Sequence, residues 1–308
     1  MEFKNINEAQ LVLLREILTN GDTVETRGLK TLELSPVIFS ITEPLERITT
    51  INNRNWDFNA AIGELIWHLS ASNDLDFIST YLKQWGNYSD DGRFITGSCY
   101  GHKIFKKGPN GKNQWNSLIN LLKDDPGSRR AVLSLYDNSE GLSLIPKDVP
   151  CTCSLQFLIR NKKVNIIVHM RSNDIILGLP YDFFFFSFLQ ELLASTLNLG
   201  IGIYTHIAGS LHLYHNHFKL AEKILASDTY EKFSMSTIEN AKNIDNFIAV
   251  EDRLRKKDIT LKEINESGLE KYWTDLLKVL YYFKGQKKGI SQSELLQIKS
   301  QTSYSVIL

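Results

Sequence analysis

Apolar residues recur at helical spacing along several stretches of the chain. Residues 7–19 repeat leucine and isoleucine every three or four positions, and residues 60–69 are apolar apart from a few polar side chains. Residues 181–199 contain a run of phenylalanines and are apolar on almost every side, which predicts a long helix buried in the centre of the core. The same periodicity predicts further helices at residues 114–122, 215–226 and 269–283.

Alternation of apolar and polar residues predicts strands at residues 32–41, 130–136, 155–159, 164–170 and 202–213. Asn161-Lys162-Lys163 separates two of these strands and predicts a hairpin. Residues 87–113 are rich in glycine and polar residues and predict an irregular surface loop. The expected fold class is therefore α+β, with a mixed or antiparallel sheet covered by helices.

Composition limits the domain number and the kind of ligand. With 43% hydrophobic residues, a chain of 308 residues can bury one large core, and we expect a single domain over residues 1–308. Basic and acidic residues balance at 35 each, so no overall charge recruits nucleic acid, although local arginines can bind a small phosphate. We therefore expect a small anionic ligand and no nucleic acid.

The chain also lacks the signals of secretion, membrane insertion and metal binding. Its most apolar stretch, residues 175–193, is interrupted by a proline and by acidic residues, and the N-terminus has no apolar core of signal-peptide length. The three cysteines do not have the spacing of a disulfide framework or of a zinc site. These features predict a cytoplasmic protein without a bound metal.

One cysteine begins an ordered group of motifs. Cys151 follows Pro150, and Arg171 ends a predicted strand that can pair with the cysteine's own. A nearby cation favours the thiolate, which is the nucleophilic form. Taken alone, Cys151 is better explained as a small core residue. The motifs that follow reverse this preference: Gln156-Phe157, Arg171-Ser172-Asn173-Asp174, Gly178-Leu179-Pro180, and His212-Leu213-Tyr214 followed by Asn216-His217.

Together these motifs, spread over residues 26–217, resemble the thymidylate synthase superfamily, which includes the pyrimidine nucleotide hydroxymethylases. The resemblance implies a thymidylate synthase-like fold. It also implies that Cys151 adds to C6 of a pyrimidine nucleoside monophosphate, and that 5,10-methylenetetrahydrofolate is the co-substrate. The region from about residue 240 onward departs from the family, whose closing C-terminal segment is not recognisable here.

The resemblance also implies a phosphate site and a homodimer. Its phosphate-binding arginines match Arg27, Arg129, Arg130 and Arg171, and its phosphate-binding hydroxyl matches Ser172. Guanidinium groups suit this task because they bind phosphate oxygens in pairs and stay charged. In the family the adjacent arginine pair reaches the site of the other subunit. Arg27 has little matching sequence around it, so a solvated loop arginine remains an alternative.

Further residues match groups that handle the base and the sugar. Glu64 matches the glutamate that moves protons at the ring, and Tyr100 the tyrosine that assists removal of the C5 proton. His212 and Tyr214 match the pair that binds the sugar, and Gln156 is assigned to base and sugar binding. A structural salt bridge is the alternative for Glu64, and ordinary polar positions on a strand are the alternative for His212 and Tyr214.

Two residues match the folate side of the site. Asp174 matches the carboxylate that holds the pterin ring, with a cap or turn residue as the alternative, and Trp85 matches a tryptophan near the folate. Thymidylate synthases have a second tryptophan shortly afterwards, where this chain has Gly86-Asn87-Tyr88-Ser89. They also have a histidine at the position of Thr152. Both departures fit a hydroxymethylase, in which water and not hydride completes the reaction.

Asp182 is the residue that selects among the branches, and it joins Cys151, Glu64 and Tyr100 as an expected catalytic residue. Thymidylate synthases carry asparagine here, whereas the cytidylate and deoxycytidylate hydroxymethylases carry aspartate. Cytosine offers an amine donor at C4 and an acceptor at N3, which a carboxyl group can satisfy. We therefore predict hydroxymethylation of a cytosine nucleotide. Ser172 and Arg130 resemble the deoxynucleotide members of the family, so the predicted substrate is dCMP. The alternatives are a CMP hydroxymethylase, a synthase that methylates dUMP, and a silent nucleotide-binding relative.

Overall fold

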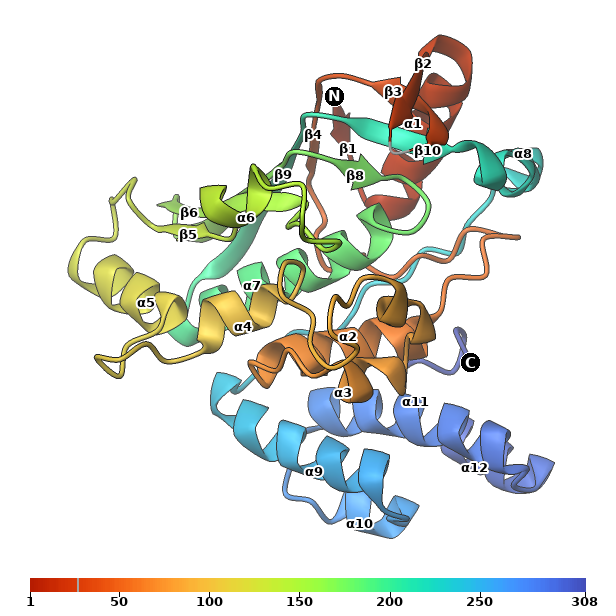
Figure 1. Ribbon diagram of the computed structural model, residues 1–308. Coiled ribbons are helices and arrows are strands. Elements are labelled where there is room, and N and C mark those ends of the chain that lie inside the picture. Colours follow the sequence, from red (N-terminus) through yellow and green to blue (C-terminus); the bar gives the residue numbers. More distant parts are fainter. Residues whose placement is uncertain (27) are drawn as a thin grey trace.

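The computed structural model describes residues 1–26 and 28–308 (Figure 1). Within these residues the strands form a six-stranded sheet in the order β1-β4-β9-β7-β6-β5 and a four-stranded sheet in the order β2-β3-β10-β8. The strands are β1 (Glu2–Phe3), β2 (Asp22–Thr26), β3 (Leu29–Leu34), β4 (Val37–Ile41), β5 (Val132–Ser134), β6 (Thr152–Arg160), β7 (Lys163–Met170), β8 (Asn173–Asp174), β9 (Gly200–Ala208) and β10 (Leu211–Tyr214). The expected α+β class is confirmed.

Helices surround the strands. The α-helices are α1 (Ile6–Asn20), α2 (Phe58–Leu69), α3 (Leu75–Ser79), α4 (Tyr100–Phe105), α5 (Gln114–Asp124), α6 (Asn138–Gly141), α7 (Leu179–Leu197), α8 (Phe218–Ser227), α9 (Ile244–Lys256), α10 (Leu261–Asn265), α11 (Lys271–Lys288) and α12 (Gln292–Ser300). Short 3₁₀ helices are η1 (Lys83–Asn87), η2 (His215–His217) and η3 (Ala241–Asn243). The helices expected at 7–19, 60–69, 114–122, 181–199, 215–226 and 269–283 are all present.

The larger sheet is mixed, and its pairing explains where the cysteine lies. β6 pairs antiparallel with β5 and β7, and β7 pairs parallel with β9. The hairpin between β6 and β7 turns at Asn161 and Lys162, whose φ angles of 51° and 59° are left-handed, as a two-residue hairpin turn requires. This confirms the predicted hairpin. It also brings the start of β6 beside the end of β7.

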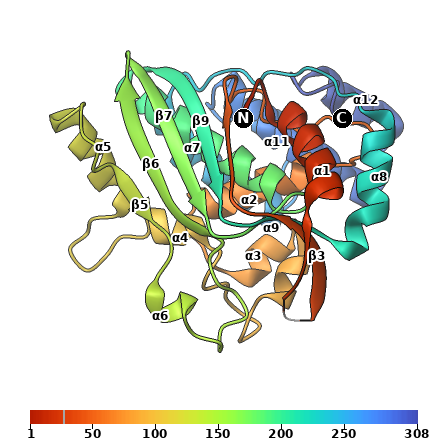
Figure 2. The ribbon, with the colours of Figure 1, turned by 90° about the horizontal axis from the view of Figure 1, so that it is seen from above.

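Helix α7 is the buried central helix that the sequence predicts. It connects β8 to β9 and packs against β7 and β9 (Figures 1 and 2). Phe183, Phe186 and Phe188 are fully buried along it. Gln190, also fully buried, donates from Nε2 to the carbonyl oxygen of Val164 at 2.8 Å, which ties the helix to the sheet. The helix therefore fixes everything at its N-terminus, including Asp182, relative to the strands.

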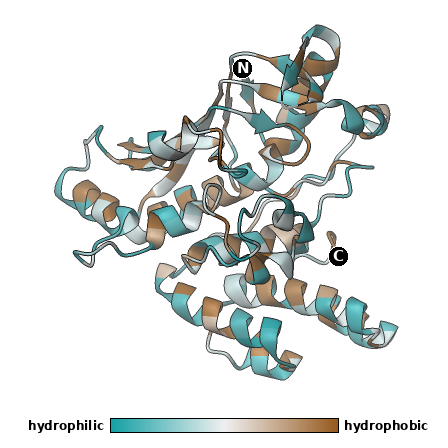
Figure 3. Ribbon diagram, viewed as in Figure 1, coloured by the Kyte–Doolittle hydropathy of each residue, from teal (hydrophilic) through white to brown (hydrophobic). Residues whose placement is uncertain are grey.

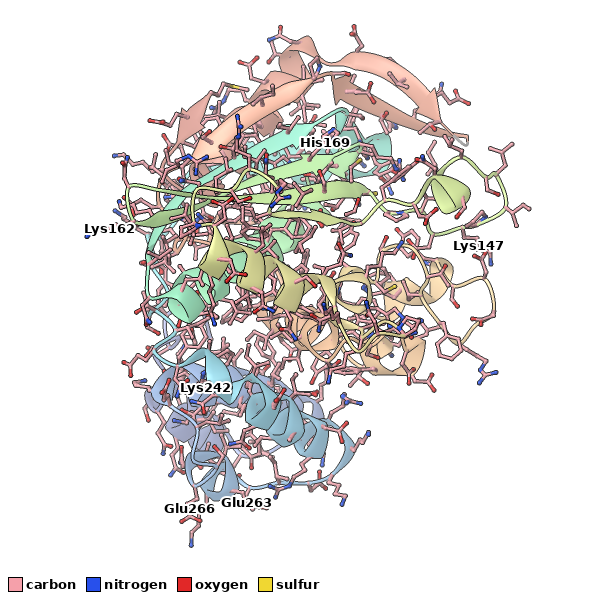
Figure 4. All side chains as sticks on the ribbon, turned by 90° about the vertical axis from the view of Figure 1, so that its left-hand side faces the viewer. Lys147, Lys162, His169, Lys242, Glu263 and Glu266 are labelled. Carbon is pink, nitrogen blue, oxygen red and sulfur yellow. The ribbon has the colours of Figure 1, made fainter. Side chains whose placement is uncertain are left out.

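The opposite face of the larger sheet is open in the protomer. Along β7 the residues Val164, Ile166, Val168 and Met170 point into the core, whereas His169 is exposed (Figure 4). Large apolar side chains on neighbouring strands are also accessible to solvent: Ile38 is 54% exposed, Val132 45% and Ile203 42%. Within residues 1–26 and 28–308, no helix or strand covers these apolar side chains on the face of the sheet.

Two predicted strands are in fact two strands each, and one predicted loop contains a helix. Residues 32–41 divide at Ser35-Pro36 into β3 and β4, and residues 202–213 divide at Gly209-Ser210 into β9 and β10. In both cases the chain leaves one sheet for the other while its apolar alternation continues, so the periodicity does not mark the break. Helix α4 lies inside the predicted irregular loop at 87–113, and its six residues are too few for a periodic signal.

The C-terminal helices pack beneath α2 and α3 (Figure 1). Apolar and polar residues alternate along them (Figure 3), as in helices with one buried face. Trp273 of α11 is fully buried and stacks edge-to-face with Phe188 of α7 at 6.2 Å between ring centroids. The C-terminal helices therefore share a hydrophobic core with α7, and the single domain stays a prediction. No helix in the described part of the chain is long and apolar enough to cross a membrane.

Candidate active site

Cys151 lies immediately before β6, next to the end of β7, where Arg171 stands. The backbone N–H of Arg171 donates to the carbonyl oxygen of Cys151 at 2.9 Å. Its guanidinium donates from Nε to the carbonyl oxygen of Pro150 at 2.9 Å, and from Nη2 to that of Val149 at 3.1 Å. Nη2 also lies 3.9 Å from Cys151 Sγ. The hairpin thus places the expected cation beside the expected nucleophile.

The charge balance around Cys151 is mixed. Burial raises the pKa of the Cys151 thiol to about 11, and the charge of Arg171 opposes that rise. The carboxyl groups of Asp182 and Asp148 act in the same direction as burial. The thiol is therefore protonated at neutral pH in this state, and nucleophilic attack requires a base to take its proton.

Asp182 lies in the first turn of α7 and is held by Asn173. Asn173 Nδ2 donates to Asp182 Oδ2 at 2.8 Å, and Asn173 itself is buried. Burial raises the pKa of the Asp182 carboxyl well above its usual value, and the nearby charge of Glu64 adds to the rise. The neutral acid is thereby favoured. A neutral carboxyl group presents one O–H donor and one carbonyl acceptor.

Tyr100 begins α4 and shares this site. Burial, followed by the charges of Asp182 and Cys151, raises the pKa of the Tyr100 hydroxyl well above its usual value. Its ring stacks on His68 of α2 with centroids 5.7 Å apart, and His68 Nδ1 accepts from the backbone N–H of Gly101 at 3.1 Å. A Cβ on Gly101 would lie 2.0 Å from the His68 carbonyl oxygen, so only glycine permits this approach of α4 to α2.

Glu64 projects from α2 toward the same group. Its side chain is 17% exposed, and its Oε1 lies 3.7 Å from Nε2 of His68. Its charge acts on Asp182 and on Tyr181, which places it at the N-terminal end of α7. The structure therefore brings Glu64, Tyr100, Cys151 and Asp182 together, and Glu64 also has a structural contact with His68.

Three residues outside the predicted set also belong to the site. Asp148 accepts hydrogen bonds from residues 97 and 98, and Asn173 holds Asp182. Burial raises the pKa of Tyr88, and the charges of Asp174 and Cys151 add to the rise. Asn173 lies inside the Arg171-Ser172-Asn173-Asp174 motif, nine residues before Asp182. Asp148 lies just before Pro150-Cys151, and no local pattern links it to a partner 51 residues away.

The arginine pair and Gln156 lie elsewhere. Arg129 and Arg130 are exposed, and Gln156 donates from Nε2 to the Arg129 carbonyl oxygen at 2.9 Å. Leu155 and Phe157 on either side of Gln156 are fully buried, so Gln156 points to the open face of the sheet. Within one protomer these three residues are therefore not joined to the cysteine group. Arg27 lies outside the described residues.

The expected sugar and folate residues meet across the smaller sheet. His212 pairs in register with Asp174, and its ring contacts that of Tyr214 edge-to-face at 5.1 Å. Burial lowers the pKa of His212, while the charges of Asp174 and Glu33 raise it. Asp174 Oδ1 accepts from the backbone N–H groups of Ile176 and Leu177 at 2.7 and 3.1 Å, so this residue also forms a turn.

Trp85, the expected folate-side tryptophan, lies among other aromatic side chains. Trp85 in η1 packs against Trp67 at 5.5 Å and edge-to-face against Tyr88 at 5.8 Å between centroids. Tyr88 is 47% exposed. Packed aromatic rings that are partly exposed are suited to contact a planar ring such as a pterin. Ser172 follows Arg171 directly and is partly exposed, so both remain available for a phosphate.

Comparisons with known proteins identify the family. The family model described as Thymidylate synthase matches residues 9–267. A deoxyuridylate hydroxymethyltransferase of Bacillus phage SP01 is 31% identical over 66% of this chain and 55% of its own, so the chain spans little more than half of that relative. A thymidylate synthase of Buchnera aphidicola subsp. Baizongia pistaciae is 28% identical over 72% of this chain and 85% of its own.

A solved structure shows the same fold. The thermostable thymidylate synthase A from Bacillus subtilis superimposes with a TM-score of 0.62 and 22% identity, covering 78% of this chain and 92% of that one. At this identity the likeness concerns the fold alone. The family model carries the assignment, since it covers most of the chain. The chain therefore belongs to the thymidylate synthase family, whose members use methylenetetrahydrofolate as a co-substrate in one-carbon transfer to a pyrimidine nucleotide.

Proposed function

We propose that this protein is a folate-dependent hydroxymethyltransferase that converts dCMP to 5-hydroxymethyl-dCMP through a covalent Cys151 adduct at C6. The observation that carries the proposal is the Asp182 carboxyl group, which burial favours in its neutral form next to Cys151 and Tyr100. Thymidylate synthases resemble this chain but carry asparagine at that position. Base recognition is therefore the step at which this chain differs from them.

The neutral carboxyl group matches cytosine. Its O–H can donate to N3 of the base, and its carbonyl oxygen can accept from the C4 amine. Asn173 supports this arrangement because its donation to Asp182 Oδ2 orients the carboxyl group without adding a charge. A pairing that left one of these buried groups unsatisfied would cost about 1–3 kcal/mol, enough to choose between bases.

The other side chains provide the proton transfers and the nucleophile. Glu64 is the candidate base within the group, and Arg171 stabilises the Cys151 thiolate once its proton has left. Addition of the thiolate to C6 raises the electron density at C5, which forms a bond to the methylene carbon supplied by methylenetetrahydrofolate. Tyr100 assists removal of the C5 proton as the carbon–nitrogen bond to the folate breaks, which releases tetrahydrofolate without oxidation and leaves an exocyclic methylene group on C5. Water adds to that methylene carbon, and the cysteine leaves C6.

A homodimer completes the phosphate site in this proposal. Arg171 and Ser172 lie at the cysteine, whereas Arg129 and Arg130 lie at an edge of the open sheet face. The exposed apolar side chains of that face support pairing with a second copy, which would carry its arginines to the neighbouring site. A cytoplasmic location, which the free thiols favour, belongs to the same proposal.

A second candidate substrate is dUMP, and the phage relative favours it by its description as a deoxyuridylate hydroxymethyltransferase. A neutral carboxyl group can also satisfy uracil if its proton sits on the other oxygen, donating to O4 and accepting from N3–H. Hydroxymethylation is common to both candidates. CMP remains the ribonucleotide variant of the first candidate, and methylation of dUMP is the thymidylate synthase variant of the second.

Release of the C5 hydrogen tests the proposal. The wild-type protein, incubated with C5-tritiated dCMP, tetrahydrofolate and formaldehyde, is expected to release tritium into water, and Cys151→Ala is expected to release none. Release from dUMP without release from dCMP would move the function to the second candidate. Nucleotide binding without release from any pyrimidine nucleotide would make the protein a silent binder.

A further inference from the structure

Two segments that are distant in sequence meet at one buried carboxylate. Residues 97–100 lead into α4 and end with Tyr100, and residues 148–151 lead into β6 and end with Cys151. Asp148, the first residue of the second segment, is 4% exposed and contacts the first segment. Lys147, the residue before Asp148 in the chain, is labelled in Figure 4 and shows where this loop lies. The resemblance to thymidylate synthases assigns no role to Asp148.

Both oxygens of Asp148 are engaged by the tyrosine segment. Oδ2 accepts from the backbone N–H of Gly97 at 2.7 Å and from that of Ser98 at 2.7 Å. Oδ1 accepts from the Ser98 hydroxyl at 2.6 Å. Hydrogen bonds to an ionised acceptor are shorter and stronger than neutral ones. This set of three bonds, which we call the Asp148 clamp, fixes the backbone just before Tyr100.

The segments are also in direct contact. A Cβ on Gly97 would lie 2.3 Å from the Asp148 carbonyl oxygen, so the close approach requires glycine at this position. On its other side the cysteine segment is bound by Arg171, which donates to the carbonyl oxygens of Val149 and Pro150. The backbone from Asp148 to Cys151 is therefore fastened both to the tyrosine segment and to the end of β7.

We propose that Asp148 is a positioning residue that sets the separation of the Tyr100 hydroxyl and the Cys151 thiol. The inference rests on the proposed function, in which Cys151 attacks C6 and Tyr100 assists proton removal at the adjacent C5. Both groups must reach neighbouring atoms of one ring. Errors of about 1 Å in such alignment reduce rates by about a hundredfold.

The charge of Asp148 does not provide a simpler explanation. It adds to the rise in the pKa of the Cys151 thiol and so opposes formation of the nucleophile. The Asp148 carboxylate therefore disfavours the Cys151 thiolate, but it holds the Tyr100 segment in position beside the cysteine segment. Removing the Asp148 carboxylate therefore distinguishes an electrostatic role from a geometric one. Loss of the charge alone would accelerate attack by Cys151, whereas loss of the clamp slows it.

The test compares Asp148→Ala and Asp148→Asn with a matched control, Asp90→Asn. Asp90 is an exposed aspartate that accepts from the backbone N–H of neighbouring Lys147 at 3.2 Å and lies outside the clamp. The readouts are kcat and KM for C5 tritium release from whichever nucleotide the wild type processes fastest. We expect kcat to fall about 10- to 100-fold in Asp148→Ala, with KM for the nucleotide within about twofold. Asp148→Asn can keep all three contacts as weaker neutral bonds, and it loses the charge that opposes the thiolate, so the fall in its kcat is expected to be several-fold smaller than in Asp148→Ala.

Amide hydrogen exchange gives a readout that does not depend on activity. The amides of Gly97 and Ser98 are expected to lose protection in Asp148→Ala and to keep it in Asp90→Asn. If the wild type releases tritium from no nucleotide, the proposed function fails, and unchanged protection at these amides would separately overturn the clamp.

A milder variant covers the case in which Asp148→Ala does not fold. Ser98→Ala removes only the hydroxyl donor and leaves both backbone donors. We expect a several-fold fall in kcat without a matching rise in KM. An unchanged kcat in a folded Asp148→Ala or in Ser98→Ala, or an equal loss in Asp90→Asn, would overturn the proposal.

Discussion

Replacing Asp182 with asparagine tests how the base is chosen. The substitution keeps the size of the side chain and exchanges a carboxyl group, whose proton can occupy either oxygen, for an amide with a fixed donor. Asn173 donates to Oδ2 at 2.8 Å, so the amide oxygen of the variant is expected to take that position and its NH₂ group the other. The variant can then offer only one arrangement of donor and acceptor to the base. It is the arrangement that the asparagine of thymidylate synthases offers to uracil.

The expected change in preference follows from one mismatched buried contact. At about 1–3 kcal/mol, such a mismatch corresponds to roughly a 5- to 150-fold change in the ratio of kcat/KM for dCMP to kcat/KM for dUMP. The ratio is measured by C5 tritium release from each nucleotide. Asp245→Asn is the control, since Asp245 also lies in the first turn of a helix, α9, but is exposed on its surface.

The result that refutes this reasoning is a ratio unchanged within about twofold in a folded Asp182→Asn protein. It would show that the carboxyl group does not read the base. A loss of activity toward both nucleotides with the ratio preserved would assign Asp182 a role in the chemistry and leave base selection to other residues. Thermal unfolding of each variant establishes that the comparison is made on folded protein.

Three further predictions concern the surroundings of the site. Arg171→Lys removes the contacts with the carbonyl oxygens before Cys151, so alkylation of Cys151 by iodoacetamide at neutral pH is expected to slow; an unchanged rate would contradict the role of the guanidinium. Asn173→Ala removes the hydrogen bond that orients the Asp182 carboxyl group, so the ratio of kcat/KM for dCMP to kcat/KM for dUMP is expected to move about tenfold closer to one. A ratio that moves further from one would contradict this. Burial lowers the pKa of His206 to about 3, below its ordinary 6.5, so its contribution to stability is present above 6.5 and is lost as pH falls toward 3. His206→Phe is expected to flatten the fall in melting temperature over that range, and an unchanged slope would contradict the assignment.

The hairpin between β6 and β7 shows what local sequence can predict. Its turn residues and its alternating strands lie within one continuous stretch, and they are sufficient to bring Cys151 and Arg171 together. The burial of α7 is also predictable from local sequence, because a run of phenylalanines is apolar on every side of a helix and is unfavourable in contact with water. The family resemblance then supplied roles for side chains that these local patterns position.

Contacts between distant segments were not predictable in the same way. Asp148 accepts hydrogen bonds from residues 97 and 98, which are 51 and 50 residues away in the chain. No sequence pattern in either segment predicts this contact. The strands β9 and β10 likewise read as one strand because apolar alternation runs on while the chain changes sheets. The arginine pair shows a further limit, because the homodimer proposed above would carry Arg129 and Arg130 to the site of a second copy, and one protomer does not contain that arrangement.

The central claim is most directly tested by one competition experiment. The protein is incubated with methylenetetrahydrofolate and equal amounts of dCMP, CMP, dUMP and UMP, the products are identified by mass spectrometry, and dihydrofolate is followed by absorbance. We predict 5-hydroxymethyl-dCMP as the main product, with no dihydrofolate formed. Thymidylate appearing in step with dihydrofolate would contradict the account, because it would show that hydride and not water completes the reaction and that the base selected is uracil.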